Sequence, residues 1–491
     1  MATLRLLAVD LGAESGRCMA GDFDGERVTL SEVHRFPNGP VALPDGLHWD
    51  VLRLFEELKA GIRRARRLGP PPAAVGLDTW GVDFALLDRR GGLVHNPYHY
   101  RDRRTEGMVE EACRRVPREE IFAHTGIQFM PINALYQLLA MVVHRDPGLE
   151  IAATFLMIPD LFAYWLTGEV ACEFTDATTS QCYDPRARGW ATALLERLGI
   201  PTHIFPRVIP PATVLGPLRP VVADEVGGTL QVIAPATHDT ASAVAAVPAE
   251  DPDFAYISSG TWSLVGAELP HPLITPESLA ANFTNEGGLG GTFRFLRNVM
   301  GLWLLQECRR RWAQEEESLT YERLAEEAAS APPFGALIDP DEERFLRPTD
   351  MPARIREYCR ETGQRVPQSR GEVVRCVLES LALKYRWVIE RLDRLLGRRT
   401  HVVHVVGGGS QNAMLCQFTA DATGRLVRAG PAEATSLGNI LAQAWALGHL
   451  SSLRDLRAVV RRSVKEAVYE PRSSEEWEEA YARLRRLLGE A

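Results

Sequence analysis

Residues 234–243 hold the side chains whose types and spacing best suit chemistry. They read Ala-Pro-Ala-Thr-His-Asp-Thr-Ala-Ser-Ala, and Asp239 stands between an apolar strand expected at 230–234 and an Ala/Val helix expected at 240–247, capped by Thr240. A carboxylate at such a junction lies near unpaired backbone N–H groups and the positive end of the helix dipole, where a phosphate would also bind. The stretch therefore predicts a base beside an anion site. The alternative is that Asp239 only caps the helix.

A glycine-containing turn near the N-terminus is the second candidate for ligand binding. Residues 10–17 read Asp-Leu-Gly-Ala-Glu-Ser-Gly-Arg and join strands predicted at 4–9 and up to about residue 23; a third strand follows at 28–36. The turn lacks the G-K-[ST] ending of a Walker loop, so it would have to cradle phosphate in another way. Tight hairpin turns also need glycine for positive φ regardless of function.

Two further strand ends carry polar or glycine-rich sequence. Residues 76–84 end a strand in Trp80, Gly81 and Asp83, a composition typical of a sugar subsite, although Trp80 suits the core equally well. Residues 401–412 give a strand, three glycines and a helix, which leaves backbone open to a flat ligand. A dehydrogenase loop is excluded there, because G-x-G-x-x-G would require glycine at Asn412 and no early βαβ unit frames the motif.

Length and composition limit the classes to which the protein can belong. The 491 residues suffice for two sizeable cores, and the net charge of −9 disfavours a nucleic-acid or anionic-membrane partner. We expect no signal peptide and no membrane span. The eight cysteines show no zinc-ligand spacing, which favours a reduced, cytoplasmic protein. Cys359 and Cys376 could pair if two helices meet there, but free buried thiols are the stronger expectation.

The chain is predicted to repeat its architecture. After a Pro- and acid-containing hinge at 246–253, a strand at 254–258, a turn at 259–260 and a strand at 261–267 echo the opening of the chain. Further helices are expected at 50–68, 300–312, 371–396 and 473–491. We therefore predict two α/β domains, residues 1–247 and 248–491.

Taken together, the motifs resemble those of the FGGY carbohydrate kinases, within the actin, Hsp70 and sugar-kinase superfold. Residues 9–17 are similar to the family's first phosphate motif, 236–243 to its second phosphate motif and 406–412 to its adenosine motif. A narrower resemblance, to members that phosphorylate L-rhamnulose, is carried by residues 78–84, 258–264, 284–288 and 298–306. The likeness runs in order from about residue 4 to about residue 450.

The resemblance implies two RNase-H-like domains around a central cleft, the first binding sugar and phosphate and the second adenosine. The implied reaction moves the γ-phosphoryl group of ATP, with Mg²⁺, to the 1-hydroxyl of L-rhamnulose. Asp239 would be the catalytic base, and Asp10 would hold Mg²⁺ through a water molecule of the ion's hydration shell. The implied sugar contacts are Gly81, His238, Asp239, Thr240 and Asn298, and the implied nucleotide contacts are Ala13, Glu14, Ser15, Gly16, Arg17, Thr261, Gln306 and Gly408.

One residue departs from the family pattern and several readings stay open. Glu14 stands where the family resemblance leads us to expect serine, so we expect the backbone N–H groups of the turn to bind phosphate and Glu14 to face solvent. The alternatives are a kinase for another ketose such as L-fuculose, a nucleotide-driven binding protein or a sugar sensor without turnover. We expect a monomer or small homo-oligomer that binds small molecules.

Overall fold

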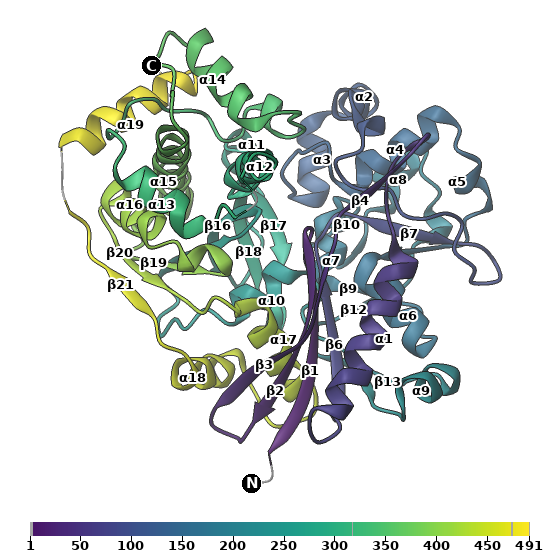
Figure 1. Cartoon of the computed structure of the whole chain (residues 1–491). Coiled ribbons are helices and arrows are strands. Elements are labelled where there is room, and N and C mark those ends of the chain that lie inside the picture. The colour runs from purple at the N-terminus through teal and green to yellow at the C-terminus, as the bar shows by residue number, and fades with distance from the viewer. Residues whose placement is uncertain (1–2, 317, 473–474, 491) are drawn as a thin grey trace. The chain divides into compact units, whose positions relative to one another are not determined.

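The computed structural model describes residues 3–316, 318–472 and 475–490 (Figure 1). The chain forms two compact units, each assembled from three segments. Unit 1 contains Met1–Glu250, Glu268–Phe295 and Glu433–Val464, and unit 2 contains Asp251–Ala267, Leu296–Ala432 and Lys465–Ala491. The functions predicted for the two halves of the chain, divided at residue 247, stay predictions.

Unit 1 is organised around a six-stranded sheet in the order β13-β14-β6-β1-β2-β3. Strands β1, β2 and β3 are successive antiparallel neighbours, whereas β6 runs parallel to both β1 and β14. The opening antiparallel strands are therefore confirmed. The sheet strands are β1 (Leu4–Leu11), β2 (Ser15–Phe23), β3 (Val28–Pro37), β6 (Ala74–Thr79), β13 (Thr213–Pro217) and β14 (Gln231–Ala234).

Shorter strands and helices complete unit 1. The helices are α1 (Val51–Arg67), α2 (Met108–Arg115), α3 (Arg118–Thr125), α4 (Ala134–His144), α5 (Pro147–Ile151), α6 (Ile158–Thr167), α7 (Phe174–Ala177), α8 (Thr192–Leu198), α9 (Pro220–Val226), α10 (Asp239–Ala245), α11 (Pro276–Ala280), α17 (Ala434–Ala446) and α18 (Leu453–Ser463). The short strands are β4 (Pro40–Leu43), β5 (Gly46–Trp49), β7 (Phe84–Leu87), β8 (Thr154–Met157), β9 (Cys172–Glu173), β10 (Tyr183–Asp184), β11 (Gly189–Trp190), β12 (Val208–Ile209) and β17 (Thr284–Gly287).

Unit 2 repeats the architecture of unit 1, as predicted, and the order of its strands is the same. Its strands lie in the order β18-β16-β15-β19-β20-β21, with β15 antiparallel to β16 and parallel to β19. The strands are β15 (Phe254–Ser259), β16 (Trp262–Leu269), β18 (Phe293–Met300), β19 (Val402–Val406), β20 (Leu426–Ala429) and β21 (Ala467–Tyr469). The helices are α12 (Trp303–Trp312), α13 (Tyr321–Ala329), α14 (Met351–Glu361), α15 (Arg370–Leu396), α16 (Ala413–Thr423) and α19 (Glu475–Leu487).

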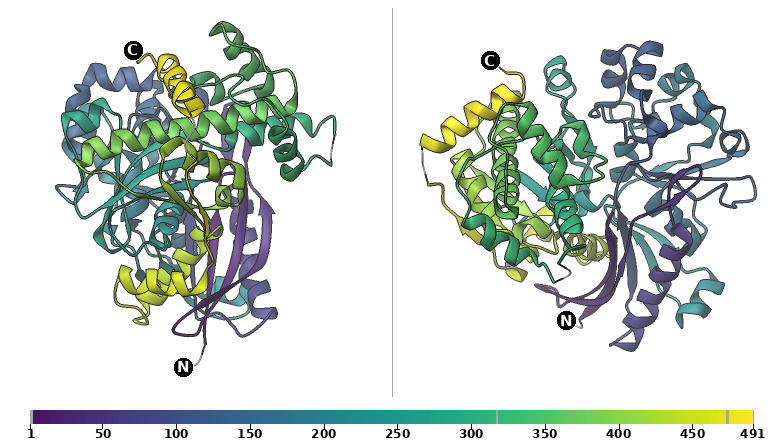
Figure 2. Two further views of the ribbon diagram at one scale, coloured as in Figure 1. Left: turned by 90° about the vertical axis from the view of Figure 1, so that its left-hand side faces the viewer. Right: turned by 45° about the horizontal axis from the view of Figure 1, so that its top comes forward.

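Local sequence explains the longest helices. In α1 the Asp50 side chain accepts a hydrogen bond from the Arg53 N–H, and buried apolar residues recur at helical spacing. In α15, the long green helix in the left view of Figure 2, Ser369 and Glu372 form a capping box and Gly397 ends the helix in the left-handed conformation. Both helices were predicted to within two residues.

The core of unit 1 explains why β1 reads as a continuous apolar run. Residues 6–11 are all buried, because α17 and α1 both pack against this strand. Helix α17 also bonds backbone carbonyls of two strands: the Gln443 side-chain amide donates to the Leu7 carbonyl at 2.9 Å, and that of Asn439 donates to the Gly76 carbonyl at 3.1 Å. A segment late in the sequence thus fixes the first two parallel strands.

Candidate active site

Two carboxylates lie side by side at the carboxyl ends of β1 and β6. Asp10 and Asp78 are partners in the parallel register of these strands, and both are buried. Asp78 accepts a hydrogen bond from the Asn439 side chain at 2.5 Å, while its Oδ1 has no hydrogen-bond partner. Burial, and then the negative charge of Asp10, raise the pKa of Asp78 well above its ordinary value. The pair is suited to a cation.

Arg17 supplies positive charge to this end of the sheet. Arg17 lies opposite Asp10 in the antiparallel β1–β2 pair, and its guanidinium donates to Asp10 Oδ2 at 2.6 Å. The same guanidinium forms an ion pair with Glu433, at the start of α17. Arg17 therefore ties the Asp10 carboxylate to the hairpin and to a distant segment of unit 1.

Hydrogen bonds and close packing fix the hairpin turn between β1 and β2. The Gly12 N–H donates to the Ser15 carbonyl at 3.0 Å, and Asn38 bonds the carbonyls of Gly12 and Glu14 at 2.8 and 2.9 Å. Gly16 packs so closely on Phe36 that a methyl group there would lie 2.2 Å from the ring. These contacts give the two glycines and Asn38 structural roles. Ala13, Glu14 and Ser15 are partly exposed on the turn.

Asp239 is the first residue of α10, and the expectation that Thr240 caps this helix is wrong. The N-cap is His238, whose side chain makes no capping bond. Instead, Asp239 Oδ1 accepts hydrogen bonds from the N–H of Thr240 at 2.5 Å and from its hydroxyl at 3.1 Å. The Asp239 side chain keeps 30% exposure. Burial, and then the charge of Asp10, raise the pKa of its carboxyl from 3.8 to about 7.

His238 is held between charged groups of unit 1. The Arg294 guanidinium lies 2.9 Å from His238 Nδ1, and the Asp239 carboxylate lies 3.4 Å from His238 Nε2. Glu286 lies 3.1 Å from Arg294 and 3.5 Å from His238 Nδ1. Burial, and then the Arg294 charge, lower the pKa of His238 well below its ordinary value. The imidazole is therefore neutral at pH 7.

Gly81 lies against the polar segment that follows β9. A methyl group at Gly81 would lie 2.9 Å from Thr179 Oγ1, which also accepts a hydrogen bond from the Val82 N–H at 3.0 Å. Thr179 in turn donates to Asp176 Oδ1 at 3.1 Å. Burial raises the pKa of Asp176 well above its ordinary value. The backbone at Gly81 thus comes close to buried polar groups, which a larger residue would push away.

The neighbouring Trp80 and Asp83, predicted as a sugar subsite, belong to the core. Trp80 stacks on Trp49 with ring centroids 3.9 Å apart. Asp83 Oδ2 accepts hydrogen bonds from the indole N–H of Trp49 at 2.6 Å and of Trp80 at 3.0 Å, and Gln137 donates to Oδ1 at 2.7 Å. The alternative reading of Trp80 as a core residue is therefore the correct one.

Four predicted ligand contacts lie in unit 2. Thr261 follows the turn at Gly260, and its carbonyl accepts hydrogen bonds from the Gly301 and Trp303 N–H groups. Gln306 projects from α12 and its Oε1 is buried without a hydrogen-bond partner. Gly408 has open space where a side chain would stand, unlike Gly409, whose added methyl would meet Ser259. Asn298 lies on β18.

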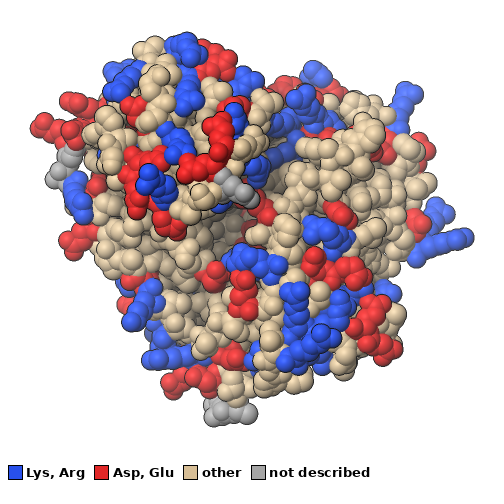
Figure 3. Space-filling view, in the orientation of Figure 1, with Lys and Arg blue, Asp and Glu red and all other residues tan. Residues whose placement is uncertain are grey.

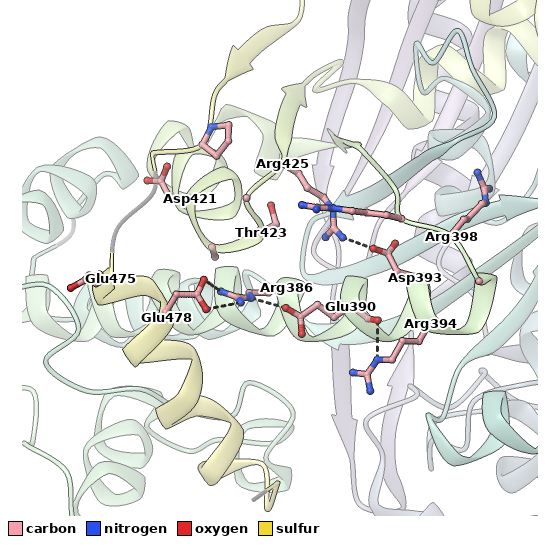
Figure 4. A pocket seen from close by; sticks show the side chains of 15 residues that line it. Arg386, Glu390, Asp393, Arg394, Arg398, Asp421, Thr423, Arg425, Glu475 and Glu478 are labelled. Carbon is pink, nitrogen blue, oxygen red and sulfur yellow. Dashed lines mark hydrogen bonds and ion pairs between the residues drawn. The ribbon is translucent and has the colours of Figure 1, made fainter.

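Unit 2 also has an open groove without these residues (Figure 4). It is lined by α15, the start of α19 and the end of α16. Arg386 pairs there with Glu390 and Glu478, and Arg425 pairs with Asp393. Charges that are already paired within the groove give no chemical reason to place the reaction there.

Lys and Arg are interspersed with Asp and Glu over the face shown in Figure 3. Among the described residues, no helix is both long enough and apolar enough to cross a membrane. The same residues contain no group of three or more His, Cys, Asp or Glu that could hold a metal ion. All eight cysteines, each in the described part of the chain, are free thiols.

Comparison with known proteins decides the family. The sequence model of the FGGY family of carbohydrate kinases matches this chain with its N-terminal domain at residues 5–246 and with its C-terminal domain at residues 255–447. The chain belongs to the FGGY family of carbohydrate kinases. The predicted family and the predicted type of enzyme are thereby confirmed.

Relatives of this FGGY kinase extend over nearly its whole length. A protein named rhamnulokinase from Bacteroides thetaiotaomicron is 44% identical over 482 residues, covering 98% of this chain and 99% of the relative. Another of the same name, from Oceanobacillus iheyensis, is 42% identical and covers 93% of this chain and 96% of the relative. The structure of a xylulose kinase from Lactobacillus acidophilus superimposes with a TM-score of 0.80 at 16% identity, covering 99% and 98% of the two chains. That likeness shows the fold.

Several residues of the candidate site received no role from the sequence alone. Asp78 and Glu286 lay inside quoted motifs, but nothing in the sequence shows that the first neighbours Asp10 or that the second neighbours His238. Arg294 carried the clearest signal, because it is a charged residue within the apolar strand sequence Phe-Arg-Phe-Leu. Glu433 and Asn439 come from so distant a segment that only the fold brings them to the site.

Proposed function

We propose that this chain phosphorylates L-rhamnulose at its 1-hydroxyl, using ATP, to give L-rhamnulose 1-phosphate in L-rhamnose breakdown. The observation that carries the proposal is the Asp239 carboxyl, whose pKa is raised to about 7 by burial and by Asp10. A base with a pKa near the working pH combines the correct protonation state with driving force for proton transfer. The relatives named rhamnulokinase support the choice of ketose.

The hydrogen bonds to Asp239 point to the oxygen that would act. Both hydrogen bonds that Thr240 donates to this carboxylate go to Oδ1. We therefore assign Oδ2 as the base. The sugar oxygen would form its bond to the γ-phosphorus as its proton passes to Oδ2, and ADP would leave. His238, Thr240, Gly81 and Asn298 are proposed to bind the sugar.

The nucleotide contacts that the family resemblance implies are proposed for this chain. Residues 13–17 would contact the phosphates, and Thr261, Gln306 and Gly408 would contact the rest of the nucleotide. The buried, unpartnered Gln306 Oε1 and the open space at Gly408 fit a ligand with amino and planar groups.

Mg²⁺ fits the acidic end of the β1–β6 pair. Asp78 Oδ1 is buried without a hydrogen-bond partner, and Asp10 is its neighbour in the sheet. Mg²⁺ usually keeps several waters and needs only one or two carboxylates, so we propose that Asp10 holds the ion. When bound, the ion would neutralise charge that develops on the phosphates.

The test combines a ketose panel with one isosteric substitution. We expect highest kcat/KM with L-rhamnulose, and we expect Asp239→Asn to lower kcat at least ~10²-fold, the lower range for loss of a general base. Melting temperature with ADP should rise equally in both proteins. Asp224→Asn, on the exposed face of α9, is the matched control. Near-normal kcat in the Asp239 variant would reduce Asp239 to a structural residue, and preference for L-fuculose would reassign the substrate.

A further inference from the structure

Arg294 is a fully buried cation that contacts three groups of unit 1. Its Nε donates to the Gly287 carbonyl at 2.7 Å, its Nη2 lies 2.9 Å from His238 Nδ1, and its Nη1 lies 3.1 Å from Glu286 Oε2. None of its surface is exposed. A buried charge with this many fixed contacts holds one geometry, because any rotation would leave the guanidinium unpaired.

The chemistry of the two partners fixes the proton on His238. A guanidinium can only donate hydrogen bonds, so His238 Nδ1 must accept and cannot carry a proton. A neutral imidazole then carries its one proton on Nε2. Nε2 lies 3.4 Å from Asp239 Oδ1, so its N–H faces that carboxylate oxygen. The same oxygen accepts a hydrogen bond from the Thr240 N–H.

We propose that Arg294 is a positioning residue that fixes His238 as the Nε2–H tautomer and so presents a hydrogen-bond donor beside Asp239. The donor adds to those of Thr240 on Oδ1 and leaves Oδ2 to face the acceptor hydroxyl. The opposite tautomer would turn a lone pair toward a carboxylate, which is repulsive. This inference rests on the proposed role of Asp239 as the base.

Glu286 explains why an arginine is needed. Glu286 Oε2 lies 3.5 Å from His238 Nδ1, so without a competing donor this carboxylate would favour a proton on Nδ1. The Arg294 guanidinium contacts both His238 Nδ1 and the Glu286 carboxylate. We therefore expect that removal of the guanidinium shifts His238 toward the Nδ1–H form or the imidazolium. In either form the Nδ1–H group would donate to Glu286.

The tautomer can be observed without any assay of activity. In the full-length protein labelled with ¹⁵N-histidine, long-range ¹H–¹⁵N spectra distinguish the protonated ring nitrogen, and His238→Gln identifies the signal. We expect Nε2–H in the unmodified protein and loss of that state in Arg294→Met. Arg294→Lys, which keeps a charge and a donor, should restore part of it. A proton on Nδ1, or on both nitrogens, in the unmodified protein would overturn the proposal.

Kinetics with the ketose test the functional half. We expect kcat to fall at least ~10-fold in Arg294→Met, within the range typical for residues that orient a functional group, while KM for ATP is unchanged. The control is Arg457→Met, a buried arginine of the same unit that bonds Glu268 at 2.9 Å and the α10 carbonyl of Val244 at 3.2 Å. It should lower the melting temperature but leave the His238 signal and kcat as they were.

The outcomes separate the two proposals. If Arg294→Met does not fold, the unmodified spectrum and the lysine variant still decide the tautomer. Unchanged kcat with a changed tautomer would refute the positioning role. A protein that phosphorylates none of the ketoses would refute the proposed function, while the spectra would still report whether Arg294 sets the proton on His238.

Discussion

Replacing Asp239 with asparagine should stabilise the ligand-free protein above neutral pH. Burial and the charge of Asp10 raise the Asp239 pKa from 3.8 to about 7 in the folded state. Between these pH values the folded protein holds a proton that the unfolded chain releases, so stability falls as pH rises from about 4 to about 7. The destabilisation is absent below pH 4 and complete above pH 7. Asparagine keeps the shape and an oxygen for Thr240 but carries no charge.

The magnitude follows from the pKa change and the exposure of the side chain. At about 1.36 kcal/mol per pKa unit, the full effect would be ~4 kcal/mol. Because the Asp239 side chain keeps 30% exposure, solvent screening reduces the expected gain to about 1–2 kcal/mol above pH 7. At pH 5 the gain in stability of the variant should be roughly a third of its value above pH 7.

The assay is a set of thermal melts without nucleotide or Mg²⁺ at pH 5 and pH 8. A chain with two units need not unfold in one step, so the comparison uses the sign and pH dependence of the change in Tm. Asp224→Asn controls for the loss of a carboxylate elsewhere in unit 1. An Asp239 variant that melts no higher than the unmodified protein at pH 8, or a gain of equal size at both pH values, would refute the raised pKa.

Four further substitutions test the surroundings of the site. Gly438→Ala places a methyl group 1.9 Å from the Ser242 carbonyl in α10, so we expect a loss of about 3 kcal/mol and a clear drop in Tm; an unchanged Tm would contradict the close packing. Asp83→Ala leaves two indole N–H groups without their acceptor, which should lower the free energy of unfolding by about 2–4 kcal/mol in denaturant titrations. A loss below about 1 kcal/mol would contradict this account of the two hydrogen bonds. Gly408→Leu enters open space, so Tm should hold while KM for ATP rises about tenfold; unchanged KM would remove Gly408 from the nucleotide site. Glu14→Ser should leave KM for ATP unchanged or lower it, whereas a marked rise would show that the carboxylate takes part.

The sequence predicted the elements of the fold well, for local reasons. Apolar runs with period two or 3.6, capping residues and glycine turns act within a few residues, so α1, α15 and the first three strands were placed nearly to their ends. The repeat of the architecture was also visible, because both halves open with a strand, a glycine turn and a strand. The start of α10 was misjudged, since Asp239 and Thr240 are both residues that cap helices.

The environment of the candidate base could not be read from the sequence. Asp10 and Asp78 are neighbours only because β1 and β6 pair in parallel, and both strands pack against α17, which begins at Ala434. The same limit applies to Arg294, which reaches His238 across more than fifty residues of chain. Burial and charge at such distances in sequence set pKa values and tautomers, and no local pattern encodes them.

The sequence by itself therefore determined the family, the two-unit α/β architecture and the position of Asp239 at a strand-to-helix junction, because these follow from local propensity and from motifs of contiguous residues. Tertiary structure alone decided that Trp80 and Asp83 are core residues, that the charge of Asp10 acts on Asp239, and that Arg294 contacts His238. The physical reason is that electrostatic and hydrogen-bond interactions act through space, and folding brings together groups whose separation along the chain carries no signal.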